Sequence, residues 1–135
     1  MAPAIAFPDG SPDRSAPLAE YTINGMTLAI PDGVMTGQLH HAFASGRYEH
    51  TEAEALLSHL RPADRFLDCR AGAGYLVSLA ARAGVAAADG VEANPDMVPV
   101  AQGNVACNGW AGTVVWGAVV GQAGDGGAVA FERTG

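Results

Sequence analysis

The sequence predicts an α/β protein organised around a Rossmann-like βαβ unit, and three features of its central stretch lead to this prediction. A short apolar run, Arg65–Cys69, has the length of a buried parallel strand. A glycine-containing turn follows, and from Tyr75 onward apolar residues recur at helical spacing. A second apolar run, Val85–Val91, ends immediately before the acid Glu92. Strand, turn, helix, strand and acid in this order are typical of a βαβ unit.

The N-terminal part of the chain is expected to hold a leader and a hairpin. Residues 1–20 are rich in Pro, Ala, Ser and Asp, which predicts a flexible leader, and residues 21–135 are expected to form one domain. Asn24-Gly25 separates two short apolar runs, Tyr21–Ile23 and Met26–Ile30. An Asn-Gly pair between two such runs is the strongest short-range signal for a β-hairpin.

Three of the four histidines lie in residues 34–50, namely His40, His41 and His50. A metal site or an acid–base cluster is one interpretation of this grouping. A polar helix followed by a loop is favoured, because adjacent residues on a helix diverge by about 100° and cannot easily bind one metal.

A helix is predicted next, because Thr51 and Glu54 have the spacing of a capping box. Leucines at positions 56, 57 and 60 give this helix an apolar stripe, and Arg61-Pro62 ends it. In the βαβ unit that follows, Gly84 is expected to end the helix in a left-handed conformation.

Another helix and two further strands are predicted after Glu92. Asn94 is a favourable N-cap, Pro95 suits the first helical position, and Pro99 should bend the helix interior at a cost of about 3 kcal/mol. Residues 113–120 are expected to form a third buried strand, and residues 128–132 begin another after a glycine-rich turn.

The central unit suits the binding of a nucleoside. Glycines let the backbone approach a ligand, a helix N-terminus attracts an anionic group, and a carboxylate after the second strand can accept hydrogen bonds from a ribose diol. Nicotinamide and S-adenosylmethionine sites share this logic. The dinucleotide pattern G-x-G-x-x-G/A fails, because Val77 stands at the third position counted from Gly72 and Arg70 lacks the first glycine. Asp68 instead fits an S-adenosylmethionine loop of the form D-x-G-x-G-x-G.

Several stretches of the chain resemble one known family. FLDCRAGAGYLVSLAARAG, GVEANPDMVPVAQGNVACNG and TVVWGAVVGQAGDGGAVAFE, with the lead-in GRYEHTEAEALLSHLRPADRFLD, resemble the FkbM family of S-adenosylmethionine-dependent methyltransferases. The resemblance runs from Thr22 to the C-terminus. It implies the N-terminal half of a Rossmann-like class I methyltransferase fold, truncated, with an N-terminal β-hairpin and helix. It also implies S-adenosylmethionine as the cofactor and O-methylation of a small-molecule or sugar hydroxyl.

The resemblance and the spacing together assign eight residues to the cofactor site: Tyr48, Glu49, Asp68, Gly72, Gly74, Glu92, Ala118 and Val119. Asp68 and the two glycines would hold the amino-acid part of the cofactor, and Glu92 would hold the ribose. The Tyr-Glu pair would line the pocket from outside the sheet, and the Ala-Val pair would form an apolar wall for the adenine. Ordinary structural roles remain open for both pairs, and no catalytic residue is assigned.

Two departures from the family pattern leave alternatives open. Arg70 replaces the first glycine of the loop, which adds bulk and positive charge near a cationic sulfonium unless the arginine pairs with the cofactor carboxylate. The chain also supplies only half of the expected sheet. We therefore consider that it is a fragment, or that another chain or a second copy completes the sheet. The alternative function is a truncated, inactive binding or interaction module, and a nicotinamide-dependent oxidoreductase is a third possibility.

Composition narrows the expected partners and location. The net charge is −7, with seven arginines and no lysine, which argues against a nucleic-acid surface. No signal peptide or membrane-length apolar stretch is evident, so we expect a cytoplasmic protein with neither nucleic-acid nor membrane partners. The small-molecule acceptor is what the family resemblance implies. Cys69 and Cys107 are expected to be small buried residues in a reducing compartment.

Overall fold

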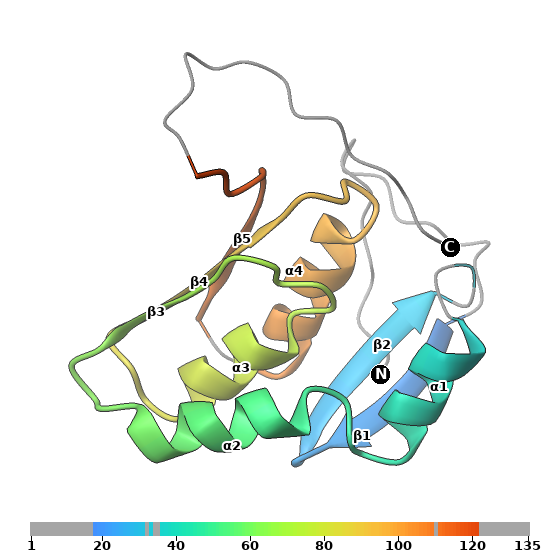
Figure 1. The fold of residues 1–135 in the computed structure, drawn as a ribbon, viewed down its shortest axis with the longest axis horizontal. Helices are drawn as coiled ribbons and strands as arrows, with labels where there is room; N and C mark the ends of the chain where they lie inside the picture. The colour runs from blue at the N-terminus through green and yellow to red at the C-terminus, as the bar shows by residue number, and fades with distance from the viewer. Residues whose placement is uncertain (1–17, 32, 34–35, 110, 122–135) are drawn as a thin grey trace.

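The computed structural model describes residues 18–31, 33, 36–109 and 111–121, and within them it contains two sheets and four α-helices (Figure 1). The elements in chain order are β1 (Leu18–Ile23), β2 (Met26–Pro31), α1 (Gly37–Ala44), α2 (His50–His59), β3 (Arg65–Asp68), α3 (Tyr75–Arg82), β4 (Ala87–Glu92), α4 (Val98–Cys107) and β5 (Thr113–Trp116). Most of the predicted leader and the strand predicted at residues 128–132 lie outside the described residues.

The predicted N-terminal hairpin is confirmed. β1 and β2 pair in antiparallel register, with Ile23 opposite Met26 at the turn. Asn24 and Gly25 both have positive φ values, 50° and 74°. A two-residue turn with positive φ at both positions matches the twist of the flanking strands, which explains why Asn-Gly occurs there.

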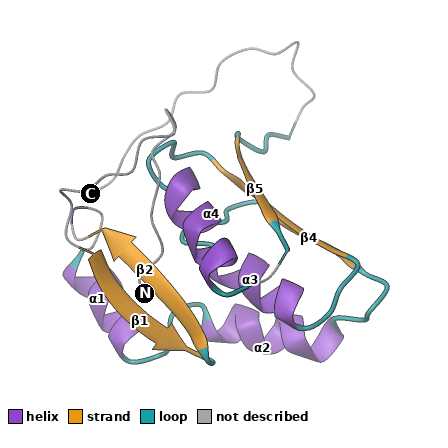
Figure 2. Cartoon of the chain, turned by 180° about the vertical axis from the view of Figure 1, so that it is seen from behind, coloured by secondary structure: helices purple, strands orange, loops and turns teal. Residues whose placement is uncertain are grey.

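The predicted βαβ unit is also confirmed, and β5 extends it to a parallel sheet of three strands in the order β3-β4-β5. Helix α3 connects β3 to β4, and α4 connects β4 to β5. Figure 2 shows both helices between the parallel sheet and the hairpin. The described part of the chain therefore has three layers, namely the hairpin, the helix pair and the parallel sheet.

Helix α3 supplies apolar side chains to both neighbouring layers. Its Tyr75 and Leu79 join a buried cluster with side chains of the hairpin, including Leu28. Its Val77 and Ala80 belong to a second cluster, which includes side chains of α4 and the parallel sheet. With four consecutive residues from Val77 to Ala80 fully buried, α3 is the central element of the fold.

Two asparagines of α4 connect this helix to strand β2. The Asn104 side chain accepts a hydrogen bond from the Ala29 N–H (2.8 Å) and donates one to the Ala29 carbonyl oxygen (3.1 Å). One turn later, Asn108 makes the same pair of bonds to Thr27, at 2.9 and 2.8 Å. Asn104 also donates to the carbonyl oxygen of Ala73 (2.9 Å), which lies in the loop before α3. The hairpin is thereby connected to the glycine-containing loop.

Two predicted helix starts are wrong. Helix α2 begins at His50, and its cap is Glu49 in a left-handed conformation, so the capping box of Thr51 does not form. Helix α4 begins at Val98, and Asn94 instead caps the turn of residues 95–97 before it, where its side chain accepts the Asp96 N–H (3.0 Å). Pro99 consequently lies in the first turn of α4, where no intrahelical hydrogen bond is lost, and the predicted bend has no cause.

Two other expectations are corrected at the ends of elements. Strand β5 ends at Trp116, four residues before the predicted end. Cys69 and Cys107 are both exposed rather than buried, because Cys69 starts the loop after β3 and Cys107 ends α4 away from the core.

Candidate functional site

The candidate site lies where the parallel strands β3 and β4 end, because both βα loops begin there. Glu92, the last residue of β4, connects the two loops. One of its carboxylate oxygens accepts the Gly72 N–H (2.9 Å), and the other accepts the Asn94 N–H (2.7 Å). A carboxylate offers about four lone-pair positions, so two of them remain for a ligand. The crevice beyond the carboxyl ends of parallel strands is the usual ligand position in open α/β sheets.

Asp68, the last residue of β3, has one satisfied and one unsatisfied oxygen. Its Oδ1 accepts the backbone N–H of Arg70 (2.9 Å). Its Oδ2 is buried and has no hydrogen-bond partner among the described residues. A buried acceptor without a donor is costly, and an added donor group would remove this cost. Asp68 is therefore suited to receive an ammonium or hydroxyl group.

Arg70 fits its position in the loop without strain. Among the described residues that are not glycine, only Asn24 and Glu49 have positive φ values, so Arg70 does not occupy a glycine-type conformation. Arg70 is exposed, and its guanidinium partly opposes the increase in the pKa of Glu49 that burial and nearby acids cause. The backbone at this position therefore does not require glycine, and the effect of the arginine on a bound ligand stays a prediction.

The two predicted glycines are required for different reasons. Gly72 has a φ of +54°, and a Cβ there would lie 3.3 Å from the Tyr48 hydroxyl oxygen. Gly74 has a φ of +84°, and a Cβ there would lie only 2.8 Å from the carbonyl oxygen of Ala101 in α4. Gly72 thus allows the loop to approach Tyr48, whereas Gly74 allows α3 to begin against α4.

Tyr48 and Glu49 reach the site from the loop between α1 and α2. The Tyr48 ring stacks on Phe43 with a centroid distance of 4.0 Å and an interplanar angle of 18°. This stacking fixes the ring, and its hydroxyl faces Gly72. The structure therefore places Tyr48 beside the loop that follows β3, and its predicted role in lining a cofactor pocket stays a prediction.

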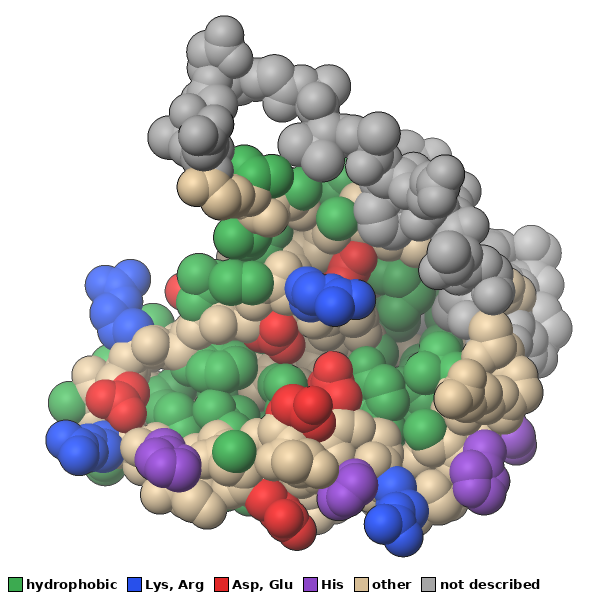
Figure 3. All heavy atoms as spheres, viewed as in Figure 1, with side chains coloured by type: hydrophobic (Ala, Val, Ile, Leu, Met, Phe, Trp, Pro, Cys, Tyr) green, Lys and Arg blue, Asp and Glu red, His purple; other side chains and the backbone are tan. Residues whose placement is uncertain are grey.

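The site is acidic, and burial together with nearby carboxylates raises the pKa of two of its groups, Glu49 and Tyr48. Burial, followed by the charges of Asp68 and Glu52, raises the pKa of Glu49 from 4.5 to about 7, against a smaller opposing effect of Arg70. Burial and the nearby carboxylates also raise the pKa of Tyr48. Figure 3 shows acidic side chains gathered near the middle of the viewed face, with a basic side chain beside them. The site therefore favours a ligand that carries positive charge.

The residues predicted to line the adenine lie beyond the end of β5. Ala118 and Val119 are both exposed, and 58% of the Val119 surface is accessible. Sequence reasoning missed Trp116, the last residue of β5, which is paired in register with Glu92. Its indole N–H donates to the Ala93 carbonyl oxygen (3.0 Å). No signal in the sequence indicates this role, because the strand is predicted to continue to residue 120 and its register with β4 is not known from the sequence.

The histidines do not form a site in the part of the chain that is described. His40 makes a hydrogen bond with the Tyr21 hydroxyl (2.7 Å), and His50 bonds the Arg47 carbonyl oxygen (2.9 Å). Among described residues, no three His, Cys, Asp or Glu side chains are placed to hold a metal ion. No helix in the described part of the chain has the length and apolar character needed to span a bilayer.

Comparison with known proteins identifies methyltransferases as similar. No family model matches the chain. Ribosomal protein L11 methyltransferase of Thermus thermophilus is 40% identical over 70 residues, which cover 50% of this chain and 27% of that protein. The crystal structure of tRNA (uracil-54, C5)-methyltransferase of Pyrococcus abyssi, in complex with S-adenosyl-L-homocysteine, matches with a TM-score of 0.61 and 14% identity. That match covers 81% of this chain and 26% of that chain.

These matches confirm the predicted Rossmann-like fold of class I methyltransferases, of which the chain has a part, and they leave the FkbM resemblance a prediction. The chain spans about a quarter of the length of either protein. The expectation of a small-molecule acceptor and no nucleic acid is contradicted, because those two proteins are named for a ribosomal protein and a tRNA. The exclusion of nucleic acid relied on net charge, which averages over the surface and does not describe a local acceptor surface, whereas the small-molecule acceptor came from the family resemblance.

Proposed function

We propose that the chain is the S-adenosylmethionine-binding part of a methyltransferase. The observation that carries the proposal is the position of Glu92, whose carboxylate holds the Gly72 and Asn94 N–H groups at 2.9 and 2.7 Å and keeps free lone pairs at the carboxyl end of β4. A ribose diol is recognised by an acid at this point of a βαβ unit. The similarity to methyltransferases supports this cofactor over a nicotinamide.

The remaining site residues suit the amino-acid end of such a cofactor, which carries an ammonium, a sulfonium and a carboxylate. The unsatisfied Oδ2 of Asp68 would accept from the ammonium. The carboxylates of Asp68 and Glu49 would favour both cationic groups. Arg70, exposed beside them, would pair with the cofactor carboxylate. Tyr48 and Gly72 would form the wall between this end and α2. When bound, the cofactor supplies an electrophilic methyl group.

We further propose a macromolecular acceptor, either protein or RNA, because the two similar methyltransferases are named for acceptors of these kinds. The FkbM resemblance is retained in the proposal for the order of motifs along the sequence, without the small-molecule acceptor that it implies. A second candidate is an inactive binding module of the same fold. It is favoured by Arg70, which stands at the first glycine position of the loop and adds bulk and positive charge near a cationic sulfonium.

The test is calorimetric titration of the chain with S-adenosylmethionine, S-adenosylhomocysteine and NAD, using the wild type and Glu92→Gln. We expect the wild type to bind the first two, and the variant to bind them about tenfold or more weakly, because hydrogen bonds to a charged group are lost. Glu54→Gln, which changes an exposed acid on α2, is the matched control and should bind like the wild type. Preferential binding of NAD, or no binding by a folded sample, would refute the proposed cofactor.

A further inference from the structure

We propose that the indole ring of Trp116 is the surface on which the adenine base of the bound nucleoside stacks. The inference deepens the proposed function and rests on it, because it takes Glu92 as the ribose acceptor. It assigns the principal base contact to a residue that the sequence pattern had placed in the core of a strand.

The register of the sheet places Trp116 directly beside Glu92. The two residues are partners across the parallel pair β4 and β5, and neighbouring strands lie about 4.8 Å apart. Gly90 and Val114, two residues earlier on each strand, are both buried, with Gly90 close to Val77 of α3. Because side chains alternate along strands, Glu92 and Trp116 leave the sheet on this same side. A ribose held by Glu92 would therefore have its base within reach of the indole.

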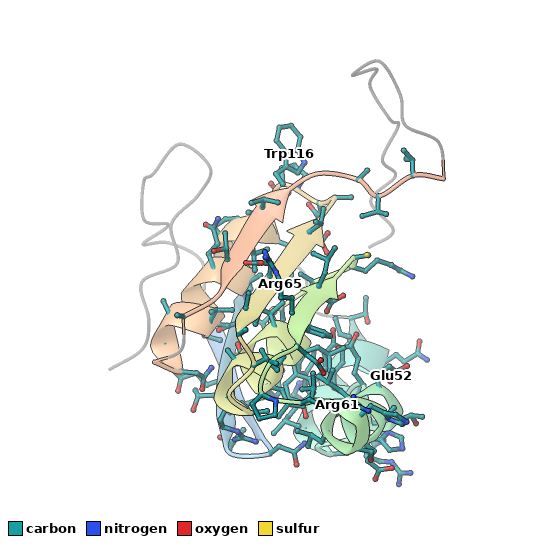
Figure 4. All side chains as sticks on the ribbon, turned by 90° about the vertical axis from the view of Figure 1, so that its left-hand side faces the viewer. Glu52, Arg61, Arg65 and Trp116 are labelled. Atoms are coloured by element: carbon teal, nitrogen blue, oxygen red, sulfur yellow. The ribbon has the colours of Figure 1, made fainter. Side chains whose placement is uncertain are left out.

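The indole is both fixed and accessible. Its N–H donates to the Ala93 carbonyl oxygen at 3.0 Å, which anchors the ring to the loop that begins after Glu92. Even so, Trp116 is 70% exposed, the highest value among the exposed large hydrophobic residues of the described chain. Figure 4 shows it at the end of the sheet toward which the strands point, away from Glu52 and Arg61. A fixed aromatic ring with an open face loses little conformational entropy when a base stacks on it.

The local chemistry favours a base over another apolar ligand. The neighbouring polar group is the Glu92 carboxylate, whose remaining lone pairs match the hydroxyl groups of a sugar. Ala118 and Val119, which follow Trp116 after one residue, would add apolar contact at the edge of the base. Neither of them has a ring to cover a face of the purine.

The test compares three probes on the wild type, Trp116→Ala and Trp116→Phe. S-adenosylhomocysteine and adenosine contain the base, whereas S-methylmethionine carries a sulfonium and an amino acid without a base. We expect Trp116→Ala to bind both base-containing probes about tenfold or more weakly and to leave S-methylmethionine unchanged. Trp116→Phe should recover much of the loss, because a phenyl ring still stacks. Leu57→Ala, which truncates an exposed apolar residue on α2, should behave like the wild type.

A second readout follows Trp116 directly. The chain has two tryptophans, so Trp110→Phe leaves Trp116 as the single reporter, and adenosine should quench its fluorescence. If the wild type binds S-adenosylhomocysteine and Trp116→Ala binds it equally well, the stacking is refuted while the cofactor assignment stands. An equal loss for S-methylmethionine would also refute it, because the effect would not depend on the base. If the wild type binds none of the probes, both the cofactor assignment and the stacking fail.

Discussion

Gly74→Ala should be among the most destabilising glycine-to-alanine substitutions in the described part of the chain. The residue has a φ of +84°, where an L side chain costs about 1–2 kcal/mol. The added Cβ would also lie 2.8 Å from the Ala101 carbonyl oxygen and 3.1 Å from its Cα, which are backbone atoms of α4. Forcing apart well-packed elements costs about 1–3 kcal/mol more. The total loss in the free energy of unfolding should therefore be about 2–5 kcal/mol.

Gly84 provides the matched control, because its φ is similar, +88°, but a Cβ there would meet no atom within 4 Å. Gly84→Ala should therefore lose only the backbone contribution of about 1–2 kcal/mol. Urea unfolding followed by circular dichroism measures both variants against the wild type, with the slope m checked for constancy. If Gly74→Ala lowers the free energy of unfolding no more than Gly84→Ala does, the contact of the added Cβ with Ala101 contributes nothing, which refutes the prediction.

Two further predictions concern buried and partly buried polar groups. Asn104→Ala should lower the free energy of unfolding by about 3 kcal/mol or more, because it leaves the Ala29 N–H and two carbonyl groups unsatisfied. Asn108→Ala, at a half-buried position, should lower it by less. Equal losses for the two variants in urea unfolding would contradict this order. For Glu49, the folded pKa of about 7 lies above the ordinary value of 4.5, so the folded state binds more protons between these values and stability should fall as pH rises from 4.5 to 7. Because the carboxyl group is partly exposed, the loss of stability should be on the order of 1 kcal/mol, and Glu49→Gln should abolish it. Identical urea midpoints of the wild type at pH 5 and pH 8 would show that Glu49 does not couple stability to pH in this way.

Features set by neighbouring residues could be predicted from the sequence. Asn24-Gly25 specifies the hairpin turn through its own backbone preferences, and the structure has that turn. The apolar runs before and after α3 specify parallel strands, whose carboxyl ends bring Asp68 and Glu92 to the same edge of the sheet. Gly72 joins them because the loop that contains it must turn at this edge.

Features set by distant contacts could not be predicted in this way. The start of α4 depends on Glu92, whose carboxylate holds Asn94 in a turn and thereby delays the helix to Val98. Asn104 looks like an ordinary polar residue in a helix, because its partner Ala29 is 75 residues away in the chain. Trp116 becomes significant only when the register with Glu92 is known. Local patterns therefore give the elements, and the cross-chain hydrogen bonds decide their ends and the composition of the site.

The asparagine contacts of α4 have a consequence for the outer edge of β2. Thr27, Ala29 and Pro31 alternate along that edge, and in a two-stranded sheet such positions would offer free N–H and C=O groups to another chain. Asn108 and Asn104 occupy the groups of the first two, and proline has no N–H to offer. Two helical side chains four residues apart thus imitate a neighbouring strand, and the hairpin is protected from edge-to-edge aggregation along this side without a third strand.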